Sequence, residues 1–355
     1  MKTRITKLFG IKHPIMLAGM NWLTQPEIVA AVCNAGGLGN LAISGHTPEG
    51  LRSDIKKIRE LTDKPFSINQ ILLSPTAKAN LAVVIDEKVP IVNYTLGRPP
   101  DIVPLIQAVH NYGGKVIATV ALARHAARAE QLGVDAINIT GHEAAAHGGY
   151  ATSLVLIPLV ASSVKIPITA AGGFYDGRGL AAALALGADG ITMGTRFAMT
   201  KECQLHEHWK QVIMKSTEQD TVYVDVGDPA VNARVMKTKK AETEMRKRFP
   251  LTEAMAGALE TKRLLKLSWW GLISSGLSTR KGEGGMGMRE QLRYAANTAR
   301  AKKVMFEGDE NAGTLAIGQV IGGIRDVPTC QELIERIVTQ AEAVLEATRE
   351  KALAK

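Results

Sequence analysis

Two glycine-rich segments have the composition of loops that hold a phosphate group. They are Ala170-Ala-Gly-Gly-Phe-Tyr-Asp-Gly-Arg178 and Gly190-Ile-Thr-Met-Gly-Thr-Arg-Phe197. Glycine at positions 172, 173 and 194 lets backbone N–H groups or a helix N-terminus approach an anion closely, and Thr195 adds a hydroxyl donor. Tight turns alone would also explain the glycines, but two such turns after adjacent strands favour a phosphate site.

A third segment, Gly141-His-Glu-Ala-Ala-Ala-His-Gly-Gly149, carries a histidine between small residues. A neutral imidazole at His147 can take a proton from carbon or from a hydroxyl group, and an imidazolium can hold an anion. A histidine that only hydrogen-bonds within its loop explains the pattern equally well. His147 is therefore a candidate catalytic residue, whereas His142 and Glu143 have no role that the sequence decides. His206-Glu-His208 lacks partners at metal-ligand spacing, so no metal site is expected.

A fourth group of residues can contact a flat ring. Gly19 and Met20, in Pro14-Ile-Met-Leu-Ala-Gly-Met-Asn21, offer close backbone approach and a soft apolar side chain, although methionine alone more often fills a core. Asn69 and Gln70 place amides where the polar edge of such a ring can be recognised.

Short aliphatic runs alternate with helical stretches over the first 200 residues, a pattern typical of repeated βα units. Near-continuous apolar strands indicate a parallel sheet covered by helices. Eight units favour a closed (β/α)₈ TIM barrel over a doubly wound sheet. The expected strands are Ile15–Ala18, Leu38–Leu41, Phe66–Asn69, Ile91–Tyr94, Val116–Val120, Ala136–Thr140, Ile168–Ala170 and Gly190–Met193.

Helix boundaries have recognisable signals. Helices are expected over Ala121–Leu132 and Leu180–Leu186, each ending at a glycine (Gly133, Gly187) suited to a left-handed conformation. Helix starts are expected at Thr24 with Glu27, at Thr47-Pro48, at Asp176, and at Thr329 with Glu332.

The pattern changes after Thr200. Residues 221–310 look helix-rich and include Trp269-Trp270 and Gly282-Glu-Gly-Gly-Met-Gly287. We interpret this stretch as a helical subdomain inserted beside the barrel mouth. The predicted organisation is a barrel of residues 1–220 and 311–355 with a helical insert at 221–310.

The bulk composition narrows the function. The net charge is +9, but acidic residues are interleaved among the basic runs and no nucleic-acid-binding motif is present. The chain has three widely spaced cysteines, an odd number that argues against a disulfide framework. No apolar run is long enough for a membrane span. We expect a cytoplasmic protein without nucleic-acid or membrane partners, with a homodimer left possible.

Together these motifs resemble the nitronate monooxygenase family, formerly 2-nitropropane dioxygenases. The resemblance extends from His13-Pro-Ile-Met16 to Pro328-Thr-Cys-Gln-Glu-Leu333. Its most specific parts are Ala171-Gly-Gly-Phe with Asp-Gly-Arg-Gly179, Met193-Gly-Thr-Arg-Phe197, and Glu143 with His147 and Gly149. The barrel of this family is shared with FMN-dependent enoyl-acyl-carrier-protein reductases and an NADH:quinone reductase.

The resemblance implies FMN as cofactor and His147 as the active-site histidine. It implies oxidation of an alkyl nitronate by O₂ to a carbonyl compound and nitrite, with His147 removing an α-proton or holding the nitronate. The implied FMN contacts are Gly19, Met20, Asn21, Asn69, Thr119, Thr140, Ala145, Ala171, Gly172, Gly173, Gly194 and Thr195.

Three features depart from the family pattern. Residues 145 and 146 are alanines where many relatives have glycine, and Thr119 stands where some relatives carry lysine. The loop Leu73-Ser-Pro-Thr-Ala-Lys78 has one proline where the quinone reductase has several, which disfavours that alternative. The leading hypothesis is an FMN-dependent nitronate monooxygenase. Its alternatives are an NADH:quinone reductase, an enoyl-thioester reductase, a non-redox barrel enzyme using the same phosphate site, and a scaffold protein with a basic insert.

Overall fold

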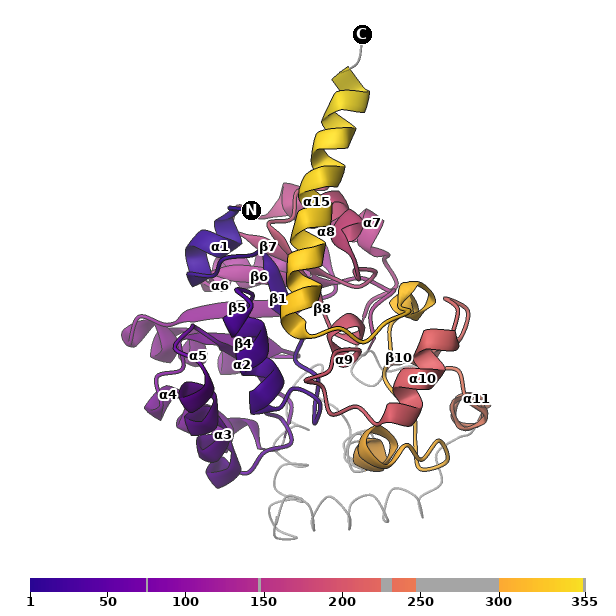
Figure 1. Ribbon diagram of the computed structural model, residues 1–355. Helices are drawn as coiled ribbons and strands as arrows, with labels where there is room; N and C mark the ends of the chain where they lie inside the picture. Colours follow the sequence, from indigo (N-terminus) through magenta and orange to yellow (C-terminus); the bar gives the residue numbers. More distant parts are fainter. Residues whose placement is uncertain (75, 146–147, 225–231, 247–299, 354–355) are drawn as a thin grey trace.

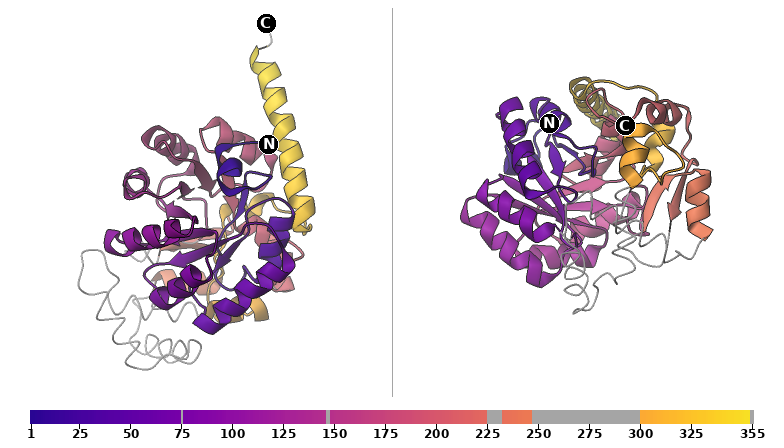
Figure 2. Two further views of the ribbon diagram at one scale, coloured as in Figure 1. Left: turned by 90° about the vertical axis from the view of Figure 1, so that its left-hand side faces the viewer. Right: turned by 90° about the horizontal axis from the view of Figure 1, so that it is seen from below.

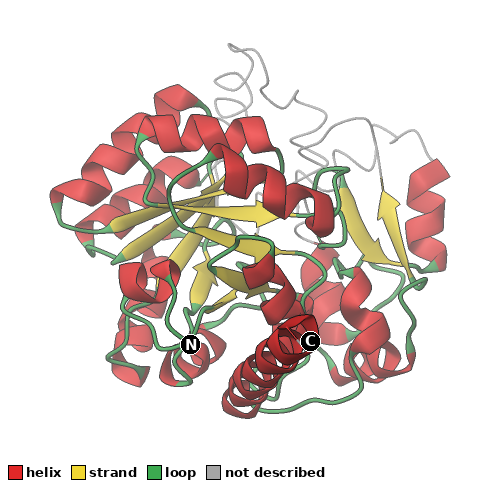
Figure 3. Cartoon of the chain, turned by 90° about the horizontal axis from the view of Figure 1, so that it is seen from above, coloured by secondary structure: helices red, strands yellow, loops and turns green. Residues whose placement is uncertain are grey.

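Eight parallel strands form the centre of the molecule. The computed structural model describes residues 1–74, 76–145, 148–224, 232–246 and 300–353. Neighbouring strands follow the order β1-β8-β7-β6-β5-β4-β3-β2, and a parallel bridge between Met16 and Leu38 joins the two ends of that row. The strands are β1 Ile15–Leu17, β2 Asn40–Ala42, β3 Ser67–Ile71, β4 Ile91–Thr95, β5 Lys115–Val120, β6 Ala136–Thr140, β7 Ile168–Ala171 and β8 Gly190–Met193. The predicted (β/α)₈ TIM barrel is confirmed (Figure 3).

Helices surround the barrel on the outside (Figures 1 and 2). The last helix, α15, packs along α8, and its C-terminal part extends beyond the barrel (Figure 1). The helices between strands are α2 Pro26–Asn34, α3 Pro48–Leu61, α4 Ala77–Asp86, α5 Pro99–Asn111, α6 Ala123–Leu132, α7 Ser153–Ser163 and α8 Gly177–Ala185. The other described helices are α1 Arg4–Phe9, α9 Thr195–Ala198, α10 Glu207–Lys215, α11 Lys239–Arg246, the 3₁₀ helix η1 Gln319–Gly323 and α15 Cys330–Leu353.

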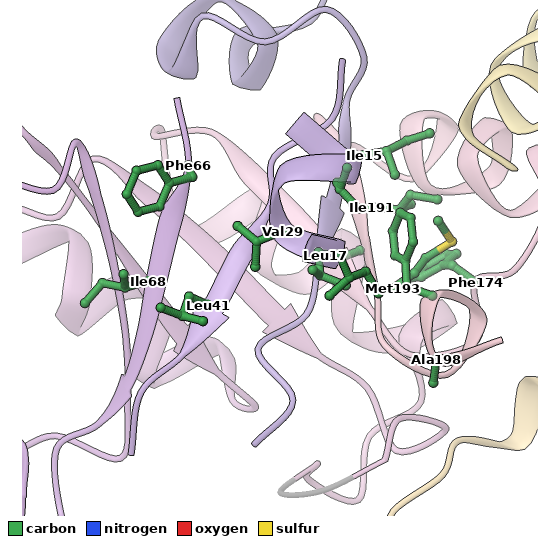
Figure 4. Packing of buried hydrophobic residues seen from close by; sticks show 14 of the residues in the cluster. Ile15, Leu17, Val29, Leu41, Phe66, Ile68, Phe174, Ile191, Met193 and Ala198 are labelled. Atoms are coloured by element: carbon green, nitrogen blue, oxygen red, sulfur yellow. The ribbon is translucent and has the colours of Figure 1, made fainter. Parts of the chain in front are cut away.

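Successive side chains along a barrel strand point to opposite faces, and they pack into two separate hydrophobic cores. Ile15 and Leu17 of β1 point outward into the large core between strands and helices (Figure 4). Met16, between them, joins a smaller cluster inside the barrel with Ile5 and Phe9 of α1. Because α1 packs against the N-terminal end of the strands, ligands have access to the interior from the C-terminal end, where barrel enzymes carry their sites.

Most helix signals in the sequence are confirmed. Thr47 and Asp176 accept backbone N–H groups at the starts of α3 and α8, and Thr329 and Glu332 cap α15 reciprocally. Gly133 and Gly187 have φ of +96° and +101°. The capping box expected at Thr24 is wrong, because α2 begins at Pro26 and its N-cap makes no side-chain bond. The Thr24 hydroxyl instead donates to the Met20 carbonyl and accepts from the Ala42 N–H, which ties the turn after β1 to β2.

The segment after β8 begins differently from the expected helical insert. An antiparallel hairpin, β9 Thr221–Val224 with β10 Ala233–Met236, lies beside the barrel (Figure 3). β10 also bonds to the returning chain, where the Met236 N–H donates to the Leu315 carbonyl. Trp269, Trp270 and the glycine stretch 282–287 lie outside the described residues, so the extent of the insert stays a prediction. Within the described ranges, no helix has the length and apolar character required to cross a membrane.

Candidate functional site

A cavity of about 350 Å³ opens at the C-terminal end of the strands. All twelve residues that the sequence singled out as cofactor contacts line this cavity: Gly19, Met20, Asn21, Asn69, Thr119, Thr140, Ala145, Ala171, Gly172, Gly173, Gly194 and Thr195. They come from six strands, so only the closed barrel brings them together. Their contact with a cofactor remains a prediction. His147 lies outside the described residues.

The corner between β7 and β8 has the features expected of an anion site, with one difference. Gly172 and Gly173 have φ of +101° and +86°, a conformation that favours glycine and turns the backbone toward the cavity. The Thr195 hydroxyl oxygen accepts from the Gly318 N–H at 2.9 Å, so its own proton is free to be donated. The α8 N-terminus is already occupied, because Asp176 and Gln340 accept its first N–H groups. At this expected anion site, the first N–H groups of α8 are therefore already bonded, whereas the Thr195 hydroxyl proton remains available to a ligand.

Gly194 and Gly19 have different physical reasons to be glycine. A Cβ at Gly194 would lie 3.5 Å from Ala18 and Met20, an ordinary contact, so the protein alone does not require glycine there. A Cβ at Gly19 would lie 2.5 Å from the Cβ of Asn69, closer than real side chains approach. Gly19 therefore allows Asn69 to pack over the strand-one turn, and Gly194 keeps space open at the corner between β7 and β8.

The floor of the cavity is a layer of neutral polar side chains that sequence reasoning identified only in part. Thr119 donates to Asn93 Oδ1 at 2.7 Å and accepts from Asn138 Nδ2 at 3.1 Å. Asn138 Oδ1 in turn accepts from Thr169 at 3.0 Å. The Thr192 hydroxyl on β8 is buried, borders the same cavity and has no partner among the described residues. Asparagine is depleted in strands, so Asn93 and Asn138 inside apolar strands were the available signal.

The loop after β6 is held from outside by the β9–β10 hairpin. Tyr223 Oη donates to the Gly148 carbonyl at 2.7 Å, and Arg234 Nε donates to the His142 carbonyl at 3.1 Å. The His142 and Tyr223 rings pack with centroids 4.7 Å apart. Within the loop, Glu143 accepts from the backbone N–H and hydroxyl of Ser153. The hairpin thus fixes backbone on both sides of the segment in which the sequence places His147.

Arg196, in the motif after β8, supports the site from behind. Its guanidinium, 2% exposed, donates to the carbonyl and carboxylate of Asp326. Burial lowers the pKa of Arg196, and the charge of Asp326 opposes that shift. A buried arginine held this way connects α9 to the segment before α15 and does not reach the cavity.

The described lining of the cavity contains no ionisable side chain. Its walls and roof are apolar, and they include residues of β10, of the helical turn around Met305 and of the segment 314–320: Ala233, Val235, Met305, Leu315, Ile317 and Val320. A neutral, polar floor beneath an apolar roof suits a flat heterocycle covered by an apolar substrate, because few but well-placed polar groups fix orientation in such pockets.

Comparison with known protein families shows to which family the chain belongs. The profile of the family described as Nitronate monooxygenase matches residues 2–82 and 76–340. The chain belongs to this family. Membership of this family and the names of its relatives indicate that the protein is an oxidoreductase.

Similar proteins divide between two named activities. The chain is 37% identical to a (3aS,4S,5R,7aS)-5-hydroxy-7a-methyl-1-oxo-octahydro-1H-indene-4-carboxyl-CoA dehydrogenase of Rhodococcus jostii, over 96% of each chain. It is 31% identical to a probable nitronate monooxygenase of Staphylococcus saprophyticus, over 79% of this chain and 93% of that one. Among solved structures, FabK from Thermotoga maritima matches with a TM-score of 0.79 and 33% identity, over 99% of each chain.

Proposed function

We propose that the protein is an FMN-dependent oxidoreductase whose substrate is a CoA thioester with an apolar carbon skeleton. The observation that carries the proposal is the cavity itself, with a glycine-lined corner between β7 and β8, a polar floor and an apolar roof. The orphaned Thr192 hydroxyl and the space kept open by Gly194 fit a bound group larger than water. A flavin bound there supplies a two-electron acceptor or donor.

Different residues of the chain would bind the cofactor and cover the substrate. Gly172, Gly173 and Thr195 would hold the phosphate, and the polar floor with Asn69 would orient the ring. The apolar roof would cover the reacting carbon and exclude water. Removal of a proton from the substrate still requires an acceptor, and the described residues that line the cavity include no ionisable side chain. We assign that role to His147, as the family resemblance implies.

The substrate class rests on two arguments. The similar CoA dehydrogenase is 37% identical and aligns over 96% of each chain. A nitronate is a small anion, and no described lining residue carries a positive charge to pair with it. The net charge of +9 suits approach of the anionic CoA moiety.

Nitronate oxidation by O₂ is the second candidate, and the family match favours it. One experiment separates the two. The FMN-loaded protein is mixed anaerobically with cyclic and linear acyl-CoA thioesters, with the matching free acids as controls, and flavin absorbance is followed. Oxygen uptake is measured in parallel with the nitronate of 2-nitropropane, and NADH oxidation with and without quinone. Bleaching by thioesters but not by acids supports the proposal. Oxygen uptake with the nitronate alone supports the second candidate.

A further inference from the structure

Trp22, in the turn after β1, has a backbone conformation that bulky residues rarely adopt. Its φ is +71°, in the left-handed region that favours glycine, so the turn is strained at this residue. Hydrogen bonds hold the strained turn in place. The Trp22 carbonyl accepts from Gln25 Nε2 at 2.6 Å. The Met20 carbonyl accepts from the N–H groups of Leu23 and Thr24. The chain thus keeps a strained tryptophan at a fixed place beside the cavity, which Trp22 borders.

The indole ring of Trp22 contacts two other segments. Gly45, in the loop after β2, packs against it so closely that a Cβ at Gly45 would lie 2.8 Å from Cζ2 of the ring. Lys302 Nζ lies 5.2 Å from the ring centroid, within the range of a cation–π contact. Lys302 belongs to the helical residues 300–307, which also carry Met305 of the apolar roof. Trp22 therefore joins the turn after β1 to the roof, and its ring has little freedom to turn.

The indole N–H of Trp22 has no hydrogen-bond acceptor. Its Nε1 is buried and unpaired among the described residues, and an indole nitrogen can only donate. Of the described residues that line the cavity, Thr192 is the other one with a buried, unpaired side-chain atom, and Thr192 lies on β8 in the polar floor. A buried donor without a partner is costly, so an acceptor on a ligand beside Trp22 would be favoured.

Trp22 lies far from the segment to which the sequence assigns proton transfer. That segment is the loop after β6, in which the sequence places His147, and β1 is three strands from β6 in the barrel order. The reacting carbon of a substrate would lie beside this loop, because a base must reach the proton that it removes. A group that contacts Trp22 therefore belongs to a part of the substrate remote from the reacting carbon.

We propose that Trp22 is a specificity-determining residue whose indole N–H donates to an oxygen on the carbon skeleton of the substrate, remote from the thioester. This inference rests on the proposed function. The acceptor is a ketone carbonyl or a hydroxyl oxygen, so the preferred substrates are acyl thioesters whose skeleton carries such an oxygen. Because the strained turn, Gly45 and Lys302 hold the ring in place before the substrate binds, little conformational freedom is lost when the contact forms.

The test compares two substrates that differ in one oxygen. They are cyclohexanecarboxyl-CoA and 4-oxocyclohexanecarboxyl-CoA, which share the thioester and the whole CoA moiety. Each is mixed anaerobically with the FMN-loaded protein, and flavin absorbance gives the limiting rate of reduction and the substrate concentration at half that rate. The quotient of rate and concentration, compared between the two substrates, measures the preference for the oxygen.

Two variants alter the contact and one serves as a control. Trp22→Phe removes the N–H and keeps an aromatic ring. Gly45→Ala places a Cβ against Cζ2 and displaces the indole without removing its N–H. Trp209→Phe is the matched control, because Trp209 is a buried tryptophan outside the cavity lining whose Nε1 donates to the Val304 carbonyl at 2.6 Å. FMN affinity, substrate preference and the apoprotein unfolding midpoint are measured for each protein.

We expect the wild-type protein to prefer the oxo substrate about tenfold, the effect of one net hydrogen bond. Trp22→Phe should remove this preference by weakening the oxo substrate alone, and Gly45→Ala should reduce it. FMN affinity should stay unchanged in both variants. Trp209→Phe should keep the preference but lower the unfolding midpoint, because it leaves a buried carbonyl unpaired. Trp22→Phe should lower the midpoint less, since its N–H has no protein partner to lose.

The inference and the proposed function fail in distinguishable ways. If both thioesters reduce the wild-type flavin without a preference, or if Trp22→Phe weakens both equally or neither, then Trp22 does not recognise an oxygen on the skeleton, and the proposed function stands. If neither thioester reduces the wild-type flavin, the proposed substrate class fails, and the assignment of Trp22 fails with it. If Trp22→Phe takes up no FMN, the preference of Gly45→Ala decides in its place.

Discussion

Asn69 packs so closely over Gly19 that a Cβ at position 19 would lie 2.5 Å from the Asn69 Cβ. The contact joins the turn after β1 to the end of β3, two elements separated by almost 50 residues in sequence. It explains why a glycine stands beside a cavity that has room elsewhere.

Gly19→Ala should displace Asn69 and tilt its amide away from the cavity. Overpacking of this kind costs about 1–3 kcal/mol, and we expect a lower unfolding midpoint together with weaker FMN binding. Fluorescence titration with FMN and thermal unfolding of the apoprotein measure the two effects. Gly50→Ala, in the first turn of α3, is the control and should leave FMN affinity unchanged. Unaltered FMN binding by Gly19→Ala would rule out a role for Asn69 at the ring.

Gly194→Ala should behave in the opposite way. The added Cβ meets only ordinary contacts at 3.5 Å, so the apoprotein should unfold at nearly the wild-type temperature. FMN retention should nevertheless fall, and more so in Gly194→Val, because the side chain occupies the space reserved for the phosphate. Gel filtration of the loaded protein followed by flavin absorbance measures retention. Full retention by both variants would place the phosphate elsewhere.

Loss of the hydrogen bonds from the β9–β10 hairpin to the loop after β6 should lower turnover more than it weakens cofactor binding. Arg234→Met leaves the His142 carbonyl without its donor, and Tyr223→Phe does the same at Gly148. Each lost bond costs about 0.5–1.5 kcal/mol, or up to 3 where the donor is charged, and loosens the loop after β6. We expect kcat to fall about tenfold or more, with FMN affinity changed less. Faster amide exchange in residues 141–149 is the independent readout, and unchanged exchange and kcat in both variants would show that the hairpin does not hold the loop.

His147→Asn should keep bound FMN and impair proton removal. With nitroalkane substrates, turnover of the neutral form should fall more than turnover of the preformed nitronate, since only the neutral form needs a base. With acyl thioesters, loss of the α-hydrogen should slow, which exchange of that hydrogen with deuterated solvent measures. Equal loss on neutral nitroalkane and nitronate would assign His147 to binding and not to proton transfer.

The periodic parts of the fold were predictable from sequence. Each expected strand lies within about two residues of an observed one, because a buried parallel strand is marked by its own aliphatic run. The cavity-lining positions were also predictable, since strand ends of a barrel converge by topology alone. The capping box predicted at Thr24 was wrong because the Thr24 hydroxyl bonds a distant partner, the Ala42 N–H, which no local pattern reveals.

The parts that escaped prediction depend on long-range contacts. Asn93 and Asn138 are isolated polar residues in apolar strands, and their partner Thr119 becomes visible only when three strands are placed side by side. The β9–β10 hairpin is stabilised by the returning segment near Leu315 and by the loop after β6, both far away in sequence. Local propensity carries no information about either neighbour.

The central claim is that the mouth cavity holds FMN, and direct titration tests it best. Apoprotein prepared by mild unfolding and refolding is titrated with FMN while flavin absorbance and fluorescence are recorded. The account predicts saturation at one FMN per chain with a shifted flavin spectrum, and weaker binding of riboflavin, which lacks the phosphate. The claim would be contradicted if the flavin spectrum stayed unchanged at all FMN concentrations. Circular dichroism must show in the same experiment that the apoprotein has refolded.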